Sequence, residues 1–350
     1  MTARSVTDPV EWSALLDRLA PRGLDDVYFR PAYCALYARP DDSSELFVFE
    51  MEGEVFALPW LVRPIESPAV RSLFDFETPY GYGGPLSTSS DPAFLGAAWN
   101  ALEGHCSRRG IVCGFIRFHP LLENHRWVHS RSVTVVNDRQ TVVLTLSKER
   151  DRVLADYSPD TRRNVRKGEK AGVKISVHTD AASLKVFACL YAAHMKELDA
   201  HDDYLFGEGY FNAVPTLGNG AWRVYLAERQ GEVLGGALIL LSGRWAHYHL
   251  SSSLKAHNAF APNAMLRHAV TMDLLGKSQE RLHYGGGRTA AADDSLLRFK
   301  GGFSPERAAF HFGGLICDPA AYEAICSHWA WTRPDLAEKY GGRFLRYRYK

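Results

Sequence analysis

The sequence predicts an α+β protein built from two domains, each with a mixed, mostly antiparallel sheet flanked by helices. The chain has 350 residues, and at about 150 residues per domain this length suggests two domains. In the second half, apolar runs and turn residues predict a strand, two helices, three antiparallel strands and a further helix. This order lacks the repeated strand–helix–strand units of a doubly wound sheet. Because the composition changes near residue 150, the predicted domains are 1–150 and 151–350.

The first half mixes helices and strands that turn residues separate. Asp8 and Pro9 predict a helix ending near residue 19, since an acidic cap followed by proline is typical of a helix start. Strand-like runs at 45–51 and 54–62 are joined by Glu52-Gly53, which favours a hairpin. The other predicted elements of this half are a short helix at 31–37, a helix beginning at Asp91-Pro92, and strands at 111–118 and 141–146.

A glycine- and proline-rich loop at 78–85 carries two aromatic side chains, Tyr80 and Tyr82. Loops with such residues often carry binding groups, so the two tyrosines are candidate ligand contacts. The alternative is an ordinary tight loop whose tyrosines pack inward.

The segment after Ser158-Pro159 predicts a strongly basic helix. Five cations and one acid fall within nine residues. Such a helix could contact the phosphates of a nucleic acid, or it could be a solvated face at a domain boundary. The cations are Arg162, Arg163, Arg166, Lys167 and Lys170.

The rest of the second half alternates helices with strands. Predicted helices cover 181–199, 209–217 and 262–275, and another begins at Asp318-Pro319. Predicted strands cover 173–178, 222–228, 233–241, 245–251, 282–284 and 307–312. The second, third and fourth of these form an antiparallel meander.

The stretch from Tyr284 to Phe303 is the strongest candidate for a functional site. A short apolar strand ends in Gly285, Gly286 and Gly287, which allow positive φ angles and close approach of another group. Asp293 and Asp294 can cap the helical turn that follows. Phe299-Lys300 is then followed by two glycines and Phe303. A single cation between aromatic residues and glycines is suited to placing the lysine ammonium at the floor of a cleft. The alternative is a loop that turns a corner, with Lys300 reaching to water.

Composition excludes several classes of protein. Formal net charge is +1, so no overall field attracts a polyanion, and any nucleic-acid contact must be local. Six scattered cysteines with no C-x-x-C pair argue against a zinc site or a disulfide framework and favour a reducing compartment. The first residues lack the apolar core of a signal peptide, and no run approaches the ~18 apolar residues of a membrane span. We therefore expect a cytoplasmic protein.

Two histidines, His247 and His249, alternate on one predicted strand and so share a face. A metal pair is conceivable, but two strand histidines without a nearby third ligand are more often structural. We therefore expect no metal site.

Three strings together resemble the Fem-type (FemABX) aminoacyltransferases, which have the acyltransferase fold of the GNAT superfamily. The basic run 161–173 is similar to the helix that begins the second domain of that family. The segment 261–266, after a strand ending in Ser251-Ser252-Ser253, resembles its strand–loop–helix unit. Gly285-Gly286-Gly287, followed by Phe299-Lys300-Gly301-Gly302-Phe303, resembles its closing signature. The resemblance covers much of 157–312 and implies two tandem GNAT-like domains.

The resemblance implies amide formation, in which a primary amine attacks the amino-acid ester of an aminoacyl-tRNA. Because the ester is already activated, the reaction needs no covalent enzyme intermediate and no cofactor besides the tRNA co-substrate. Catalysis then depends on positioning and on stabilising an oxyanion. Lys300 and Phe299 are the implied catalytic residues, and the five cations of the basic helix are the implied tRNA contacts. Candidate substrate-binding residues are Tyr80, Tyr82, Tyr204, Tyr210, Tyr284, Gly285, Gly286, Asp202 and Asp203.

The stretch 202–211 departs from the family pattern. Many relatives place an arginine, which helps to hold the diphosphate of the acceptor, a few residues before a Tyr-Tyr or Tyr-Phe pair. Here Tyr210-Phe211 keeps the pair, but Asp202, Asp203 and Glu208 stand in place of any arginine. Acidic groups repel a diphosphate and attract an amine. This departure argues against a nucleotide-linked peptidoglycan precursor and leaves room for a small peptide or antibiotic-type amine. The expected acceptor is thus an amine-bearing peptide, either the peptidoglycan precursor that the resemblance implies or a small peptide natural product.

Two other functions remain open. A CoA-dependent N-acyltransferase of the same fold cradles the pyrophosphate on successive backbone N–H groups, usually in a Q/R-x-x-G-x-G/A loop. The corresponding segment 255–262 has no glycine, and Pro262 lacks an N–H, which argues against CoA. A non-catalytic binding protein is the second alternative, and the intact Phe299-Lys300 pair argues against it. A serine hydrolase is excluded by the lack of a G-x-S-x-G motif.

Overall fold

A computed structural model describes residues 1–70, 72–199 and 204–349. The chain divides into two compact units, the first made of residues 1–24, 28–138 and 310–350, the second of 25–27 and 139–309. This division differs from the predicted domains, because residues 310–350 return to the first unit. There, residues 312–316 form an antiparallel pair with residues 113–117. Strands β7 (Val133–Thr145) and β13 (Arg307–Ile316) each carry residues of both units.

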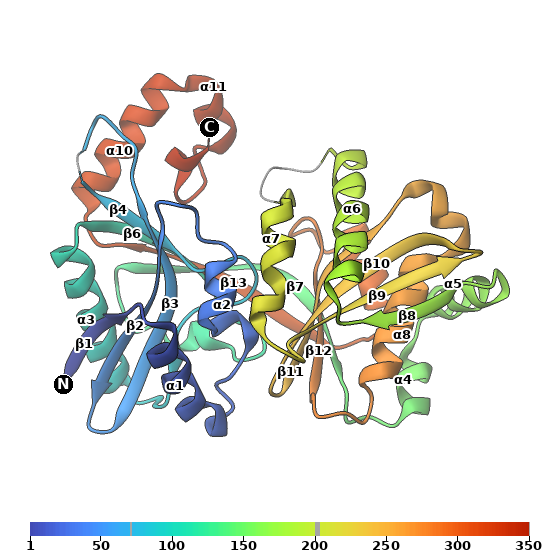
Figure 1. The fold of residues 1–350 in the computed structure, drawn as a ribbon. Coiled ribbons are helices and arrows are strands. Elements are labelled where there is room, and N and C mark those ends of the chain that lie inside the picture. Colours follow the sequence, from blue (N-terminus) through green and yellow to red (C-terminus); the bar gives the residue numbers. More distant parts are fainter. Residues whose placement is uncertain (71, 200–203, 350) are drawn as a thin grey trace. The chain divides into compact units, whose positions relative to one another are not determined.

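The first unit is a sheet with helices on both faces (Figure 1). Its strand order is β1-β2-β3-β4-β6-β13, and β5 pairs with β3. Its strands are β1 (Thr2–Val6), β2 (Ser43–Met51), β3 (Glu54–Pro64), β4 (Phe74–Glu77), β5 (Leu86–Ser87) and β6 (Ile111–Arg117), joined by the last part of β13. Its helices are α1 (Pro9–Leu19), α2 (Pro31–Ala35), α3 (Pro92–Arg108), α10 (Pro319–Thr332) and α11 (Pro334–Tyr340).

Alternating side chains of the hairpin β2–β3 fill two separate cores. Phe47 and Phe49 pack with α3, whereas Leu46 and Val48 pack with α1. A strand directs successive side chains to opposite faces, so this alternation buries both faces of the sheet. The predicted hairpin turn is confirmed, since both Glu52 and Gly53 have positive φ.

The second unit contains the predicted three-strand meander, which is confirmed (Figure 1). Its strand order is β7-β12-β11-β10-β9-β8, and of these pairs only β11–β12 is parallel. Its further strands are β8 (Lys174–His178), β9 (Trp222–Arg229), β10 (Glu232–Ser242), β11 (Trp245–Ser253) and β12 (Arg281–Gly286). Its helices are α4 (Arg150–Asp156), α5 (Pro159–Lys170), α6 (Ala181–Glu197), α7 (Glu208–Ala213), α8 (Pro262–Leu274) and α9 (Ser295–Gly301).

Helices α6 and α8 cover opposite faces of this second sheet. Gly236 on β10 lies against Phe187 of α6, so that an added Cβ there would overlap the ring. The next residue, Ala237, belongs to the core that contains Leu266 and Val270 of α8. The predicted α+β class is therefore confirmed. In the described ranges, no helix is both long enough and apolar enough to cross a membrane.

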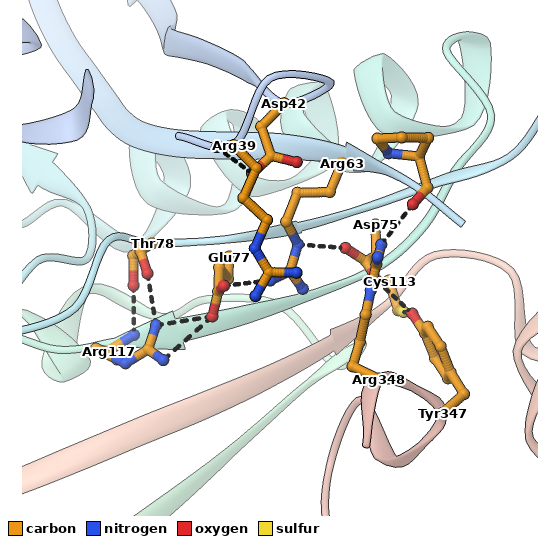
Figure 2. Close-up of polar contacts among 11 residues, drawn as sticks. Arg39, Asp42, Arg63, Asp75, Glu77, Thr78, Cys113, Arg117, Tyr347 and Arg348 are labelled. Carbon is orange, nitrogen blue, oxygen red and sulfur yellow. Dashed lines mark hydrogen bonds and ion pairs between the residues drawn. The ribbon is translucent and has the colours of Figure 1, made fainter. Parts of the chain in front are cut away.

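A buried network of charges fastens the end of the chain to the first sheet (Figure 2). Asp75 on β4 accepts hydrogen bonds from Arg63 Nε and Arg348 Nε, both at 2.8 Å, and from the Tyr347 hydroxyl at 2.7 Å. Asp75 is fully buried. Because a buried carboxylate is stable only with such partners, Tyr347 and Arg348 are held firmly against the sheet.

A second carboxylate, Glu77, joins the same network (Figure 2). It pairs with Arg63 and accepts two bonds of 3.1 Å from the guanidinium of Arg117. Burial opposes ionisation of Glu77, but the charges of Arg63, Arg117 and Arg348 outweigh it and hold its pKa below the ordinary value. Arg63 Nη2 has no hydrogen-bond partner among the described residues. No other group of the network could therefore accept a bond from Arg63 in place of Glu77.

Replacement of Glu77 by glutamine should lower the free energy of unfolding at pH 7 by about 3 kcal/mol, because the buried Arg63 loses a counter-ion. The pKa of Glu77 is lowered on folding, so its contribution is present above its ordinary pKa of 4.5 and is lost as the pH falls through the lower folded value. The loss of stability in acid should therefore be weaker in the variant. Urea unfolding followed by tryptophan fluorescence at several pH values measures both effects. Exposed Glu338→Gln is the control, and equal stability of the two variants would contradict this account.

Candidate functional site

The predicted glycine turn lies at the end of β12, where the strand leaves regular pairing. Gly285 has a φ of +77°, and the register with β7 shifts between His283 and Gly285. Gly287 lies so close to the Asp294 carboxylate that a Cβ would overlap it. Glycine is therefore required at both positions, for conformation at Gly285 and for space at Gly287.

Asp294 closes the loop that follows the glycines. One carboxylate oxygen accepts from the N–H groups of Leu296 and Leu297 at 2.9 Å, which caps α9 as predicted. The other accepts from the N–H groups of Arg288 and Thr289 at 3.1 Å. These bonds, led by the one from the Leu297 N–H, lower the pKa of Asp294 to about 2. The carboxylate thus stays ionised and fixes the loop.

Lys300 on α9 points back to the glycine turn. Its Nζ donates a hydrogen bond of 2.7 Å to the carbonyl oxygen of Gly286, and its side chain is half-buried. Burial, followed by the charge of Arg267, lowers the pKa of Lys300 to about 7. At neutral pH this side chain can therefore both donate a proton and take one up.

The surroundings of Lys300 are positive. Arg139 on β7 donates from Nη1 to the carbonyl oxygens of Gly287 and Arg288, both at 3.1 Å. Arg267 on α8 is buried and acts electrostatically on Lys300, whereas Asp294 is the acid that acts on it in the opposite sense. Three cations and one carboxylate therefore surround this turn, which favours an anionic group or a developing negative charge.

Aromatic rings support the turn from the interior of the second unit. Phe299 and Phe303 lie edge to face with ring centroids 5.8 Å apart, and Phe303 lies 5.2 Å from Tyr157 in the same geometry. Tyr284 is fully buried, and its hydroxyl bonds Thr271 of α8. Tyr284 was predicted to bind substrate, but its side chain lies in the hydrophobic core because β12 is buried there.

The Lys300 motif is joined to the start of the basic helix α5. The N–H of Ser158, which caps α5, donates to the carbonyl oxygen of Gly302 at 2.9 Å. Gly302 lies so close to Ser158 and Thr161 that a Cβ would overlap their hydroxyl groups. The predicted catalytic lysine and the predicted basic helix therefore belong to one rigidly packed part of the second unit.

The predicted basic helix is confirmed as α5, and four of its five cations are exposed. Arg163, Arg166, Lys167 and Lys170 are exposed. Arg162 is half-buried and donates to the carbonyl oxygen of Ala155 at 3.4 Å. Arg163 pairs with Asp160 at 3.0 Å, but both side chains are about three-quarters exposed, so the pair is weak and easily exchanged for another anion.

The predicted residues Tyr204 and Tyr210 lie near α6 and α7. Tyr210 is nearly buried, and its hydroxyl is 2.8 Å from His249 Nε2. Tyr204 is 43% exposed, and its carbonyl oxygen accepts from the Tyr191 hydroxyl. A cavity of about 400 Å³ opens beside this segment, lined mainly by apolar groups that include Tyr191, Met195 and Phe206. Asp202 and Asp203 lie outside the described residues.

Tyr80 and Tyr82 belong to the first unit, where their rings join an aromatic cluster. Tyr82 lies edge to face with Tyr28 at 5.7 Å, and Tyr80 lies 6.0 Å from Tyr37. Both are half-buried. The intervening Gly81 has a φ of +99° and lies against Tyr28, where a Cβ would overlap the ring. The rings of Tyr80 and Tyr82 therefore pack against other aromatic rings of the first unit, but part of each side chain remains exposed to solvent.

The two histidines of β11 have separate hydrogen-bond partners. His247 Nε2 lies 2.7 Å from Asp26 Oδ2, and His249 Nε2 bonds Tyr210. Burial, followed by the charge of His247, lowers the pKa of His249 to about 3. Both histidines therefore have a side-chain partner, and their structural role stays a prediction.

In the segment 255–262, where a CoA-binding loop would lie, several N–H groups already have partners within the protein. The N–H of His257 donates to Leu254, and that of Ala261 donates to Asn258. Ala261 has a φ of 52°, and α8 begins at Pro262, which has no N–H. The loop therefore offers few of the donors that a pyrophosphate needs.

Sequence reasoning missed Arg139 and Arg267 as residues of the site. Arg139 lies in a part of β7 that was not predicted as a strand. Arg267 follows Ala264, Met265 and Leu266 on α8, and its guanidinium lies over the rings of Tyr248 and Phe299 of the same core. A single arginine within an apolar helix stripe was the available signal for Arg267.

Comparison with known proteins defines the class of this fold. Residues 156–301 match the family described as "Acetyltransferase (GNAT) domain". A search of solved structures finds the tandem GNAT protein from the clavulanic acid biosynthesis pathway, with a TM-score of 0.53, 14% identity, and coverage of 91% of this chain and 99% of that one. The protein therefore has a GNAT-type acyltransferase fold.

Two further comparisons point to Fem-type proteins within this fold class. A UDP-N-acetylmuramoylpentapeptide-lysine N(6)-alanyltransferase of Weissella viridescens is 24% identical over 220 residues, which are 59% of this chain and 64% of the relative. The alignment thus spans just under two thirds of that relative. The crystal structure of FemX has a TM-score of 0.70 and 13% identity, covering 93% of this chain and all of that one. These comparisons agree with the predicted resemblance: the chain is similar to Fem-type proteins and has the fold of FemX.

Proposed function

We propose that this protein is an amide-forming aminoacyltransferase that moves an amino acid from aminoacyl-tRNA to the primary amine of a peptide-type acceptor. The observation that carries the proposal is that Lys300, which bonds the glycine turn, lies two residues before Gly302, which packs directly against the cap of the basic helix α5. This arrangement brings a cation suited to acyl transfer next to a surface suited to phosphates. The Fem-type relatives support the same reaction class.

The proposed reaction is a direct displacement at the ester carbonyl. The neutral acceptor amine forms the new C–N bond, and the carbonyl electron pair moves to oxygen. Collapse of this intermediate breaks the bond to the ribose oxygen, which leaves as a hydroxyl after gaining a proton, while the nitrogen loses one. No cofactor is required, because the ester supplies the driving force.

Lys300 is proposed to act on the oxygens of this reaction. As an ammonium it donates a hydrogen bond to the carbonyl oxygen as negative charge develops there. With a pKa of about 7 it can also give a proton to the departing ribose oxygen. Phe299 is proposed to hold the Phe303 ring, against which it packs edge to face. Arg139 is proposed to hold the glycine turn in place through its bond to the carbonyl oxygen of Gly287.

The acceptor is proposed to be a peptidoglycan precursor or a small peptide natural product. The first choice is supported by the relative whose name specifies the lysine of UDP-N-acetylmuramoylpentapeptide. The second is supported by the acidic sequence 202–208, which disfavours a diphosphate. Because charged tRNA is a cytoplasmic molecule, the proposed reaction takes place in the cytoplasm.

The donor can be identified by offering radiolabelled aminoacyl-tRNAs and labelled acetyl-CoA, in parallel, to candidate amine acceptors. We expect transfer from aminoacyl-tRNA, and no calorimetric signal for acetyl-CoA at micromolar concentration. The reason is that the N–H groups of His257 and Ala261 are already bonded and Pro262 has none. Micromolar binding of acetyl-CoA together with acetyl transfer would favour the CoA-dependent alternative. Failure of both donors would favour a binding protein.

Lys300→Ala should reduce turnover by roughly 10²-fold or more, since one preorganised donor to an oxyanion has about this effect. The pH profile should change as well. If transfer needs a neutral amine and a protonated Lys300, log kcat/KM rises with pH and levels off near 7 in the wild type. The variant should lack that bend.

A matched control for Lys300 is Lys277→Ala, which removes a surface lysine that is paired with Asp273. Its turnover and its pH profile should stay at the wild-type values. Wild-type turnover in Lys300→Ala would remove Lys300 from the mechanism.

Reversal of the exposed cations Arg163, Arg166 and Lys167 to glutamate should raise the KM for charged tRNA, because the new carboxylates repel phosphates. The salt dependence of binding should become shallower, by about 0.7 to 0.9 in the log–log slope for each phosphate that is no longer neutralised. Arg162 is left unchanged because it bonds the backbone of Ala155. Lys185→Glu with Lys277→Glu is the control for charge reversal elsewhere in this unit. An unchanged KM and slope would mean that α5 is only a solvated face.

A further inference from the structure

Arg267 is a buried cation in the middle of α8. It is 2% exposed, and no ion pair joins it to an acid among the described residues. Within the same ranges its Nε has no hydrogen-bond partner. Its Nη1 makes one long bond of 3.5 Å to the carbonyl oxygen of Asn263. Burial of a cation with so little compensation opposes folding.

Two aromatic rings partly compensate for this burial. The guanidinium carbon of Arg267 lies 4.4 Å from the ring centroid of Tyr248 and 5.0 Å from that of Phe299. Cations over ring faces at such distances are attracted by the ring electrons. Arg267 on α8 therefore contacts Phe299 on α9, the residue next to Lys300.

We infer that Arg267 is a positioning residue of the site, whose guanidinium holds the Phe299 ring and whose charge disfavours a second cation at Lys300. A methionine would fill similar space in this apolar core without the cost of an uncompensated charge. The charge is therefore better explained by its effect on Lys300 than by stability. This inference deepens the proposed acyl transfer and rests on it for the role of Lys300.

Several groups besides Arg267 surround Lys300. Burial and the charges of Arg267 and Arg139 lower the pKa of Lys300, whereas Asp294 raises it. Of these cations, Arg267 has the larger influence, and Arg139 is additionally engaged by two backbone carbonyls. Further titratable groups on the elements around this motif include Arg298 on α9, His268 and Asp273 on α8, Tyr248, His247 and His249 on β11, Tyr284, Arg281 and His283 on β12, Tyr157 before α5 and Arg307 on β13.

The experiment measures the protonation of Lys300 without using the enzymatic reaction. Intact protein is labelled with a trace of acetic anhydride over a range of pH, and the labelling of Lys300 is quantified by peptide mass spectrometry. Only the neutral amine reacts, so the midpoint reports the protonation of this lysine. Arg267→Met should move the midpoint to higher pH, because a repelling charge is removed. Arg267→Lys should restore it toward the wild-type value.

A matched control is Arg229→Met, which removes a guanidinium that lies 4.5 Å from the Phe260 ring and is not among the groups that act on Lys300. Its labelling midpoint should equal that of the wild type. Circular dichroism and thermal melting identify the folded variants, and Arg267→Gln replaces the methionine variant if that one does not fold. A structural role alone would lower the melting temperature and leave the midpoint unchanged.

An unchanged midpoint in a folded Arg267→Met or Arg267→Gln variant would overturn the inference. A raised midpoint supports it, and the bend in the pH profile of transfer should then move upward by the same amount. The labelling needs no substrate, so its result is independent of whether the wild-type protein transfers an amino acid. The failure of the proposed function and the failure of this inference are therefore distinguishable.

Discussion

The hydrogen bond from Lys300 to the carbonyl oxygen of Gly286 is the contact on which the site depends. It fixes the ammonium against a turn whose shape requires glycine at Gly285 and Gly287. The lysine stays half-buried, so its charge is not fully hydrated and is strongly influenced by neighbouring groups. A cation in such a position has already given up part of its solvation before any substrate arrives, which is the condition for effective electrostatic catalysis.

Local signals predicted the elements best where a cap or a tight turn marked their ends. Asp8, Asp91 and Ser158 each cap a helix as the sequence indicated, and the meander of the second unit was predicted from its turns. Short or polar strands were missed. β1 and β4 have four or five residues, and the first part of β7 alternates without strong hydrophobicity, so their pairing depends on neighbours distant in sequence.

The site was predictable in part for the same reason. Lys300, Phe299 and the glycines lie in one contiguous stretch with an unusual composition, and Asp294 was recognisable as a cap. Arg139 and Arg267 could not be assigned to the site, because only the folding of β7 and α8 brings them to it. The burial of Tyr284 in the core could not be predicted either, because a strand of a few residues is too short to show from its sequence which face is covered.

The return of residues 310–350 to the first unit affects how the chain can fold. During synthesis the amino-terminal unit emerges first, but it lacks the strand that pairs with β6 and the tail residues that neutralise buried Asp75. Those segments follow the whole second unit in the sequence, so this unit cannot reach its final state until residues 310–348 have been synthesised. The usual order, in which an amino-terminal domain matures while the rest is still being made, is therefore closed to it.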